Sequence, residues 1–432
     1  MGLREAIEHG DYDAVFQSLY PGTPIMHTRD RWTQVVGGYA SVFGENDKLS
    51  LFSAPGRIEI GGNHTDHQHG CVLAAAVSLD VIAAAAPNDT NKINIHSEGF
   101  LPYSIDLSEL STSADEYGES SALVRGIADQ FYETVCPVSG FDAYIASDVP
   151  AGSGLSSSAA FEVLIGTIVN SMFNDGKSTP QEIARIGQYA ENVFFGKPSG
   201  LMDQTASAVG GAVAIDFADP DNPLIERIAV GLDDYRICIT ATGGDHSDLT
   251  GEYASIPEEM SAVAEIFGEK WLRDVPPSHF FERLADVRAT LGDRAALRGF
   301  HFFAENERAQ AEADALKKND THAFLRLVAE SGRSSLALLQ NISIPGAVRE
   351  QPMALALALS EKLLGSRGAT RVHGGGFAGT ILAFVPINAL ESYTAGMETI
   401  TGKATCRVVS IRSAGGVCLA PIVTPEYQHP DN

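Results

Sequence analysis

The stretch PAGSGLSSSAAFE, residues 150–162, joins a predicted strand at 141–149 to a predicted helix at 156–173. Gly152 and Gly154 permit a bend in which successive backbone N–H groups point inward. Three serines then begin the helix, where free amides and the positive helix end favour an anion. A turn that only caps a core helix is the alternative, but a cap needs one serine. The stretch therefore predicts a phosphate-binding loop.

Strands and helices alternate along the rest of the chain. Residues 1–48 favour helices, with a polar break at PGTP, and residues 255–365 are mostly helical. The predicted strands are 49–60, 71–86, 91–97, 141–149, 211–217, 235–242, 370–385 and 404–411. The stretch 71–86 also has some helical character, and a further helix is predicted at 181–195. This alternation predicts an α+β fold of two joined halves with a boundary near 225–245.

Composition limits the kind of partner. The 432 residues are 44% hydrophobic and carry 30 basic against 55 acidic side chains, for a formal charge of −25. This excess of acid disfavours binding to nucleic acid and to anionic membranes. The most apolar stretch, 71–86, is too short to span a bilayer, and the five scattered cysteines indicate neither zinc nor a disulfide framework. We expect a reduced, cytoplasmic protein that binds small molecules.

Two other glycine-containing stretches match nucleotide motifs only in part. GGGFAG, 374–379, has the G-x-G-x-x-G spacing, but the strand-like TILAFV follows it where a dinucleotide-binding motif needs a helix. A glycine-rich hairpin turn explains it equally well. GKS, 176–178, lacks the first glycine of a P-loop, because Ser171 occupies that position.

Two polar stretches carry the remaining candidate chemistry. APGRIEIGGNHTDHQHG, 54–70, is consistent with a metal site, a phosphate cradle, a sugar site or a polar turn. GKPSGLMDQ, 196–204, presents Asp203 after a turn. A carboxylate beside a phosphate cradle can accept the proton of an acceptor hydroxyl. Alternatively, Asp203 only caps the next helix.

Together these stretches resemble the GHMP kinase superfamily, and within it the galactokinases. GRIEIGGNHTDHQHG is similar to the galactokinase signature GRxNLIGEHTDYNxG, and PAGSGLSSSAAFE and GKPSGLMDQ resemble the ATP loop and the catalytic loop. FFAENERAQAEADAL and SGRSSLALLQNIS resemble galactokinase helical segments, and RVHGGGFAG resembles the third, glycine-rich motif. The resemblance covers nearly the whole chain.

The resemblance implies a GHMP kinase fold of the α+β class, with two domains of mixed or antiparallel sheets and packed helices. A helical extension would occupy residues 1–48, the N-terminal kinase domain 49–235 and the C-terminal domain 236–432. The implied activity moves the γ-phosphate of ATP, with Mg²⁺, to the anomeric hydroxyl of galactose. We expect a monomer whose partners are the sugar and ATP.

The resemblance also assigns roles to residues. Asp203 would be the catalytic base or orienting carboxylate, and Arg57 would pair with it and stabilise the transferred phosphoryl group. Ser158 and Glu191 match the Mg²⁺ ligands. The implied sugar contacts are Arg57, Asn63, His64, Asp66, Asp203 and Tyr253. The implied ATP contacts are Gly152, Ser153, Gly154, Leu155, Ser156, Ser157, Ser158 and Ala159.

The departures from the signature leave the sugar open. Asn63 stands where galactokinases have the glutamate expected at the sugar O6 hydroxyl, and Glu59 replaces the usual asparagine. His67 replaces a tyrosine and Ala378 a glycine. An amide at position 63 would tolerate a charged C6 carboxylate, so galacturonate joins N-acetylgalactosamine and L-arabinose as an alternative to galactose.

Two further alternatives concern the kind of protein and the role of the histidines. An inactive sensor that binds galactose and ATP is the alternative from another class, but the intact serine loop, Arg57, Glu191 and Asp203 favour catalysis. His64, His67 and His69 have a spacing that could hold a metal, although no suitable carboxylate or cysteine set accompanies them. Surface or supporting histidines are the favoured interpretation.

Overall fold

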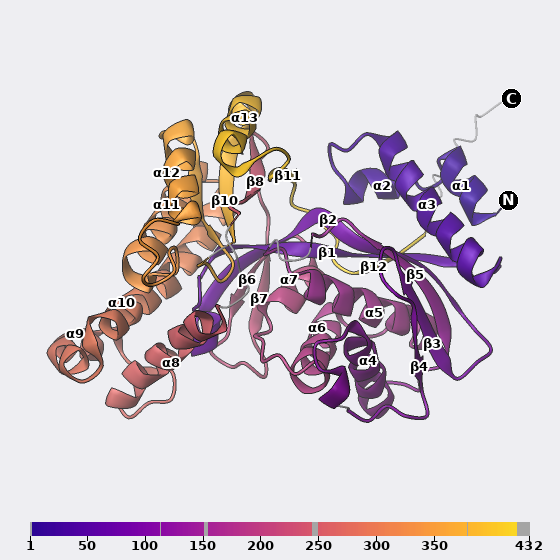
Figure 1. Cartoon of the computed structure of the whole chain (residues 1–432), viewed down its shortest axis with the longest axis horizontal. Coiled ribbons are helices and arrows are strands. Elements are labelled where there is room, and N and C mark those ends of the chain that lie inside the picture. The colour runs from indigo at the N-terminus through magenta and orange to yellow at the C-terminus, as the bar shows by residue number, and fades with distance from the viewer. Residues whose placement is uncertain (1, 113, 151–153, 244–248, 378, 421–432) are drawn as a thin grey trace, which may run out of the picture.

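The computed structural model describes residues 2–112, 114–150, 154–243, 249–377 and 379–420 (Figure 1). Its larger sheet has the order β12-β1-β2-β5-β3-β4, and β6 joins β2 to β7. All pairs are antiparallel except the parallel pair β3–β5. The strands are β1 (Ser50–Gly61), β2 (Cys71–Pro87), β3 (Lys92–Ser97), β4 (Tyr103–Asp106), β5 (Phe141–Ser147), β6 (Ala212–Asp216), β7 (Leu224–Ile228) and β12 (Val417–Leu419).

The smaller sheet is antiparallel throughout, with the order β11-β8-β10-β9. Its strands are β8 (Tyr235–Ala241), β9 (Ala369–His373), β10 (Thr380–Pro386) and β11 (Cys406–Val409). Strands β9 and β10 pair directly on either side of the glycine-rich stretch 374–379. That stretch therefore lies in a hairpin and does not begin a helix. Strand β12 returns the chain to the larger sheet beside β1.

Three groups of helices surround the sheets (Figure 1). The first contains α1 (Leu3–His9), α2 (Asp13–Leu19) and α3 (Ile25–Phe43), and α3 packs on β2 and β5. The opposite face carries α4 (Ser120–Thr134), α5 (Ser157–Phe173), α6 (Pro180–Tyr189) and α7 (Met202–Val209). The third group, at the left of Figure 1, contains α8 (Thr250–Ile266), α9 (Pro277–Glu282), α10 (Leu284–Lys317), α11 (Thr321–Ser334), α12 (Pro352–Leu364) and α13 (Leu390–Thr401).

Short helical turns lie between these elements. The 3₁₀ turns are η1 (Asp66–Gln68), η2 (Ala114–Glu116), η4 (Leu272–Asp274) and η6 (Ile387–Ala389), and the π-helical turns are η3 (Ala190–Phe194) and η5 (Ser335–Leu339). Among the described residues, no helix combines the length and the apolar composition that crossing a bilayer requires.

Strand β2 is a strand along its whole length, although its alanine-rich sequence has some helical character. Its side chains are buried except at Ser78, Leu79 and Pro87, which are partly exposed. The small alanines allow helices to approach both faces of the sheet, and a strand covered on both faces is apolar almost continuously. The α+β class is confirmed, whereas β4, β7, β12, α4 and α13 were not among the predicted elements. The division at 48 and 235 stays a prediction.

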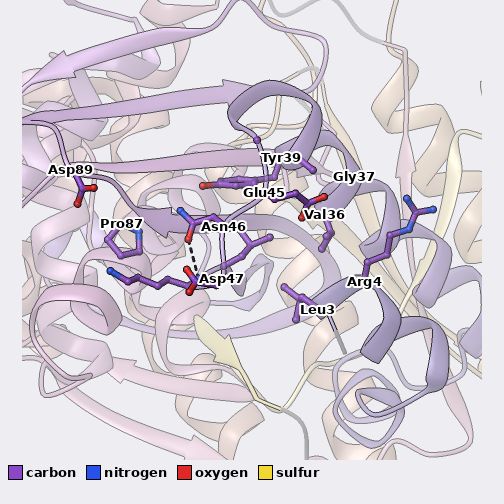
Figure 2. A pocket seen from close by; sticks show the side chains of 15 residues that line it. Leu3, Arg4, Val36, Gly37, Tyr39, Glu45, Asn46, Asp47, Pro87 and Asp89 are labelled. Carbon is purple, nitrogen blue, oxygen red and sulfur yellow. Dashed lines mark hydrogen bonds between the residues drawn. The ribbon is translucent and has the colours of Figure 1, made fainter.

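A pocket of about 830 Å³ lies beside the N-terminal helices (Figure 2). Its lining comes from α1, α3 and the segment before β1, and includes Arg4, Tyr39, Asn46 and Lys48. The side-chain oxygen of Asn46 accepts the backbone N–H of Lys48 at 2.9 Å and shapes this segment. No residue predicted for the functional site lines the pocket, so that site is identified from side-chain geometry.

The buried carboxylate of Asp80, on β2, joins distant parts of the chain. It accepts hydrogen bonds from the Tyr20 hydroxyl (2.7 Å), Arg31 Nη1 (2.6 Å) and Arg412 Nη1 (2.8 Å), and from the Ser53 hydroxyl. Burial alone would raise the pKa of Asp80, but the two guanidinium groups outweigh it and hold the pKa below its usual range. Asp80 thus fixes the N-terminal helices and the C-terminal segment to the larger sheet.

We expect Asp80→Asn to lower the free energy of unfolding by ~3 kcal/mol or more, because it leaves Arg31 and Arg412 without a buried countercharge. Urea unfolding followed by circular dichroism measures the loss. Asp148→Asn is the matched control: Asp148 also pairs with Arg31, at 3.0 Å, but its side chain is 49% exposed. The control should cost less than ~1 kcal/mol. Equal losses in the two variants would contradict the role given to Asp80.

Candidate active site

Arg57 and Asp203 form a two-point ion pair between β1 and α7. Arg57 Nε lies 2.6 Å from Asp203 Oδ1, and Nη2 lies 2.6 Å from Oδ2. Burial alone would raise the pKa of Asp203, but the charge and hydrogen bonds of Arg57 keep it below its ordinary value. The Asp203 side chain is still 29% exposed. An ionised carboxylate therefore faces accessible space while its position is fixed by Arg57.

Asp203 does not cap the helix in which it lies. The helix α7 begins at Met202, and no side chain caps its first turn. Its carboxylate instead binds Arg57 on β1 and accepts a hydrogen bond from the Ser156 hydroxyl at the start of α5. Asp203 therefore lies between these two elements. The capping alternative is thus not what the described contacts show.

The serine loop lies directly against this pair. Ser156 is the N-cap of α5 in a left-handed conformation (φ 53°), and the carbonyl of Gly154 accepts a hydrogen bond from Arg57 Nη1. The backbone N–H of Arg57 also donates to the carbonyl of Leu155 at 3.1 Å. Ser157, Ser158 and Ala159 follow in the first turn of α5. Gly152 and Ser153 lie outside the described residues.

Gly154 occupies a position that only glycine suits. Its φ is +73°, and a Cβ atom there would lie 2.8 Å from Thr380 Oγ1 and 3.1 Å from His373 Nδ1. The loop therefore passes close to β9 and β10 of the smaller sheet. This approach brings the start of α5 between the two sheets.

Glu191 lies in the π-helical turn η3 and is buried. Its Oε1 accepts Lys197 Nζ (2.8 Å) and the Ser158 hydroxyl (3.2 Å), and its Oε2 accepts the Ser199 hydroxyl (2.6 Å) and Gln204 Nε2 (2.9 Å). The two residues predicted as Mg²⁺ ligands are thus in direct contact. Hydroxyl and carboxylate oxygens are the donors that Mg²⁺ prefers.

Glu162, the last residue of the stretch 150–162, was not predicted as part of the site from the sequence. Its carboxyl group is fully buried on α5, and Oε2 accepts the Gln204 amide at 2.9 Å, while no described residue bonds to Oε1. Burial, with the nearby charge of Glu191, raises the pKa of Glu162 well above its usual value. Burial therefore favours the neutral form of Glu162, and the Gln204 amide links it to Glu191.

The side chain of Asn63 is fully buried and its bonding positions are filled by protein groups. Its Nδ2 donates to Glu59 Oε1 (2.8 Å) and to the Gly374 carbonyl (2.9 Å). Its Oδ1 accepts Asn341 Nδ2 (2.9 Å) and the Ser335 hydroxyl (3.2 Å). A sugar contact for Asn63 stays a prediction, and it would require one of these four bonds to break.

His64 and Tyr253 contact the glycine-rich hairpin. His64 Nε2 lies 3.1 Å from the Gly375 carbonyl, and no described residue bonds to the buried Nδ1. Burial lowers the pKa of His64 to about 3, so the ring is neutral and Nδ1 is an acceptor. The Tyr253 hydroxyl donates to the Gly376 carbonyl at 3.0 Å.

Asp66 lies near Gly200, in the turn that precedes Asp203, and not at the glycine-rich hairpin. Its Oδ2 is 2.7 Å from where a Cβ atom of Gly200 would be, and its Oδ1 accepts the N–H of His67 at 3.0 Å. The other two histidines of the stretch have structural contacts: the ring of His67 lies 5.5 Å from that of His64, and the ring of His69 lies 4.3 Å from that of Trp271. No cluster of three or more His, Cys, Asp or Glu side chains that could hold a metal occurs within the described ranges.

The described site thus has two parts. Arg57, Asp203, Ser156, Ser158 and Glu191 gather where α5 and α7 meet β1, whereas Asn63, His64 and Tyr253 converge on residues 374–376. The sequence also did not predict the residues that hydrogen-bond to Asn63 and Glu59 in the second part, which are Asn341, Ser335, Arg371 and His373. Their spacing along the chain gives no signal, because the fold brings them together from distant segments.

Two parts of this chain match models of protein families, and most of its length matches known relatives. Residues 38–87 match the galactokinase galactose-binding signature, and residues 122–211 match the N-terminal domain of GHMP kinases. The galactokinase of Glaesserella parasuis is 34% identical over 81% of this chain and 88% of the relative, and that of Actinobacillus pleuropneumoniae is 34% identical over 82% and 89%. A Lactococcus lactis galactokinase, solved in complex with galactose, has the same fold, with a TM-score of 0.77 at 22% identity over 90% of this chain and all of that one.

The fold and the loop at the start of α5 define a GHMP kinase. The identity and coverage of the relatives are specific enough to go further: the chain belongs to the galactokinase family. It is accordingly a phosphotransferase that uses ATP and a hydroxyl acceptor, as the resemblance implied.

We expect Glu162→Gln to be at least as stable as the parent at neutral pH. The folded-state pKa of Glu162 is raised, so its contribution is fully present below the unfolded pKa, near ~4.3, and is lost as pH rises toward the folded pKa. Glutamine has no such loss, so the stability difference in its favour should grow with pH, by ~1.4 kcal/mol for each unit of pKa shift. Urea unfolding at several pH values between acid and neutral measures this, and parallel curves for parent and variant would contradict it.

Proposed function

We propose that this chain transfers the γ-phosphoryl group of ATP to the anomeric hydroxyl of galactose. The observation that carries the proposal is the Arg57–Asp203 pair, fixed by two contacts of 2.6 Å and joined through Ser156 to the start of α5. A carboxylate for the acceptor hydroxyl and a helix N-terminus for phosphate are thereby adjacent. The names of the relatives support the choice of sugar.

In the proposed reaction, Asp203 accepts a hydrogen bond from the anomeric hydroxyl and orients its oxygen for attack on phosphorus. Its lowered pKa makes it a weak base, so the proton moves to it only as the new P–O bond forms. Arg57 keeps the carboxylate ionised and places positive charge beside the transferred group. The free N–H groups at the start of α5 would bind phosphate oxygens, and the serine loop would add further contacts to them.

Ser158 and Glu191 would hold Mg²⁺, since their oxygens lie 3.2 Å apart beside the phosphate end of the site. The ion, when bound, neutralises charge on the phosphate oxygens. Lys197 compensates the charge of Glu191 in the described structure, and it has to release Oε1 for a cation to bind there. A cytoplasmic location and a monomeric state remain expectations from the sequence.

Asp203→Asn should lower kcat for galactose by roughly 10² or more, because the amide cannot take the proton. The dissociation constant of ATP should change little, since the serine loop keeps its backbone. Steady-state ADP release and calorimetric ATP binding measure the two effects. Asp175→Asn is the control, because its exposed carboxylate contacts only Lys177 among the described residues. Near-normal turnover of Asp203→Asn would remove Asp203 from the mechanism.

Glu191→Gln should raise the Mg²⁺ concentration needed for half-maximal activity by about 10-fold or more, because a neutral amide is a weaker ligand for a hard cation. Titration of Mg²⁺ at fixed ATP gives this value. A second readout is the calorimetric affinity for ATP with and without Mg²⁺: the gain that Mg²⁺ brings to the parent should shrink in the variant. An unchanged gain would place the metal elsewhere.

A further inference from the structure

Glu59 lies two residues after Arg57 on β1. Side chains of alternate residues point to the same face of a strand, so Arg57 and Glu59 share a face. The side chain of Glu59 is only 6% exposed. Its Oε1 accepts Arg371 Nη2 at 2.7 Å and Asn63 Nδ2 at 2.8 Å. Glu59, which differs from the asparagine of the galactokinase signature, is thus held within the site by hydrogen bonds.

The second oxygen of Glu59 is different. No described residue donates a hydrogen bond to Oε2, and this atom is not among the fully buried unbonded atoms of the described chain. Burial raises the pKa of Glu59 and outweighs the positive charges of Arg371 and Arg57, which favour its ionised form, while the charge of Asp66 adds to the rise. A carboxylate oxygen with accessible surface therefore lies within electrostatic reach of the two residues predicted on either side of the sugar.

The position of Glu59 is fixed from both sides. Its backbone N–H donates to His373 Nε2 at 3.3 Å. The fully buried Arg371 holds its Oε1 and also donates to the Ile60 carbonyl. A group held in this way needs no reorganisation when a ligand binds, which is the property of a residue that selects among ligands.

We propose that Glu59 determines the sugar specificity of this site: its free oxygen accepts a hydrogen bond from a neutral hydroxyl remote from the anomeric carbon, and its charge excludes sugars with a carboxylate there. The inference rests on the proposed function and names its substrate class, a neutral aldose. Two residues along a strand span ~6.6 Å. Glu59 is thus displaced from Arg57 by a distance comparable with the width of a pyranose ring.

The sequence departure supports this assignment. The galactokinase signature has asparagine at position 59 and glutamate at position 63, whereas this chain has Glu59 and Asn63. Because the two side chains are in contact, the exchange keeps one carboxylate and one amide together and moves only the charge. A carboxylate therefore remains in the site although residue 63 is an amide, and tolerance of galacturonate does not follow from Asn63.

The test compares the parent with Glu59→Gln on galactose and on galacturonate, each with ATP. We expect kcat/KM for galactose to fall by about 10-fold or more, as for loss of a charged hydrogen-bond acceptor. The ratio of kcat/KM for galactose to that for galacturonate should fall by about 10-fold or more as well. This ratio does not depend on the fraction of folded enzyme, so partial unfolding caused by the unpaired Arg371 cannot produce the effect.

Two further variants sharpen the test. Glu312→Gln is the matched control, since Glu312 is another buried carboxyl group near β1, packed against Gly61, and its ratio should equal that of the parent. The exchange variant with Glu59→Asn and Asn63→Glu should recover most of the discrimination that Glu59→Asn alone loses. An unchanged ratio in Glu59→Gln, or no recovery in the exchange variant, would overturn the role of Glu59.

Failure of the proposed function has a different signature. If the parent phosphorylates neither sugar, the proposed reaction is wrong. Calorimetric binding of galactose in the absence of ATP still tests Glu59 in that case. Weaker binding by Glu59→Gln, with the Glu312→Gln variant unchanged, would support the sugar contact, and equal binding by all three proteins would overturn it.

Discussion

Strand β1 carries polar side chains through the interior of the protein, and each of them must be paired there. Its burial is complete except at its first residue. Ser53 binds Asp80, Arg57 binds Asp203, and Glu59 binds Arg371. Leaving any of these charges without its partner in the interior costs several kcal/mol. The need to satisfy them fixes which elements can lie beside β1, and so determines where the site forms.

This requirement also couples the two sheets. Arg371 belongs to β9 of the smaller sheet, yet it donates to Glu59 and to the Ile60 carbonyl on β1. The hairpin that follows β9 supplies carbonyl groups to Asn63, His64 and Tyr253. The part of the site proposed to bind sugar is therefore made by contacts between the halves. The part proposed to bind phosphate joins β1 to α5, α7 and η3, and its Gly154 lies close to β9 and β10 of the smaller sheet. A change in the packing of the halves would therefore reach both parts, through Arg371 in the first and through the close approach of Gly154 to β9 and β10 in the second.

The sequence was sufficient for the family, the fold class and the main strands and helices, because the periodicity of β1, β2 and α5 is local and the motifs keep their order. It also named Arg57 with Asp203, and Ser158 with Glu191, and the structure places both pairs in contact. The surroundings of Asn63 could not be predicted in this way. Its partners Ser335 and Asn341 lie more than 270 positions along the chain, and only the fold shows that its amide is already bonded. The sugar role given to it from the signature therefore remains untested.

Two helices of the site contain a π-helical turn, and these turns bear on how the chain can vary in length. Glu191 lies in η3, and Ser335, which binds Asn63, lies in η5. A π turn accommodates one residue more than an α turn within the same helix. Because the wide turn takes up that extra residue, removal of one residue from either turn would give regular α-helix and leave the segments on either side in nearly the same alignment. The effect of such a deletion would therefore be confined to the turn itself, where it would change the positions of Glu191 or Ser335 relative to Ser158 and Asn63.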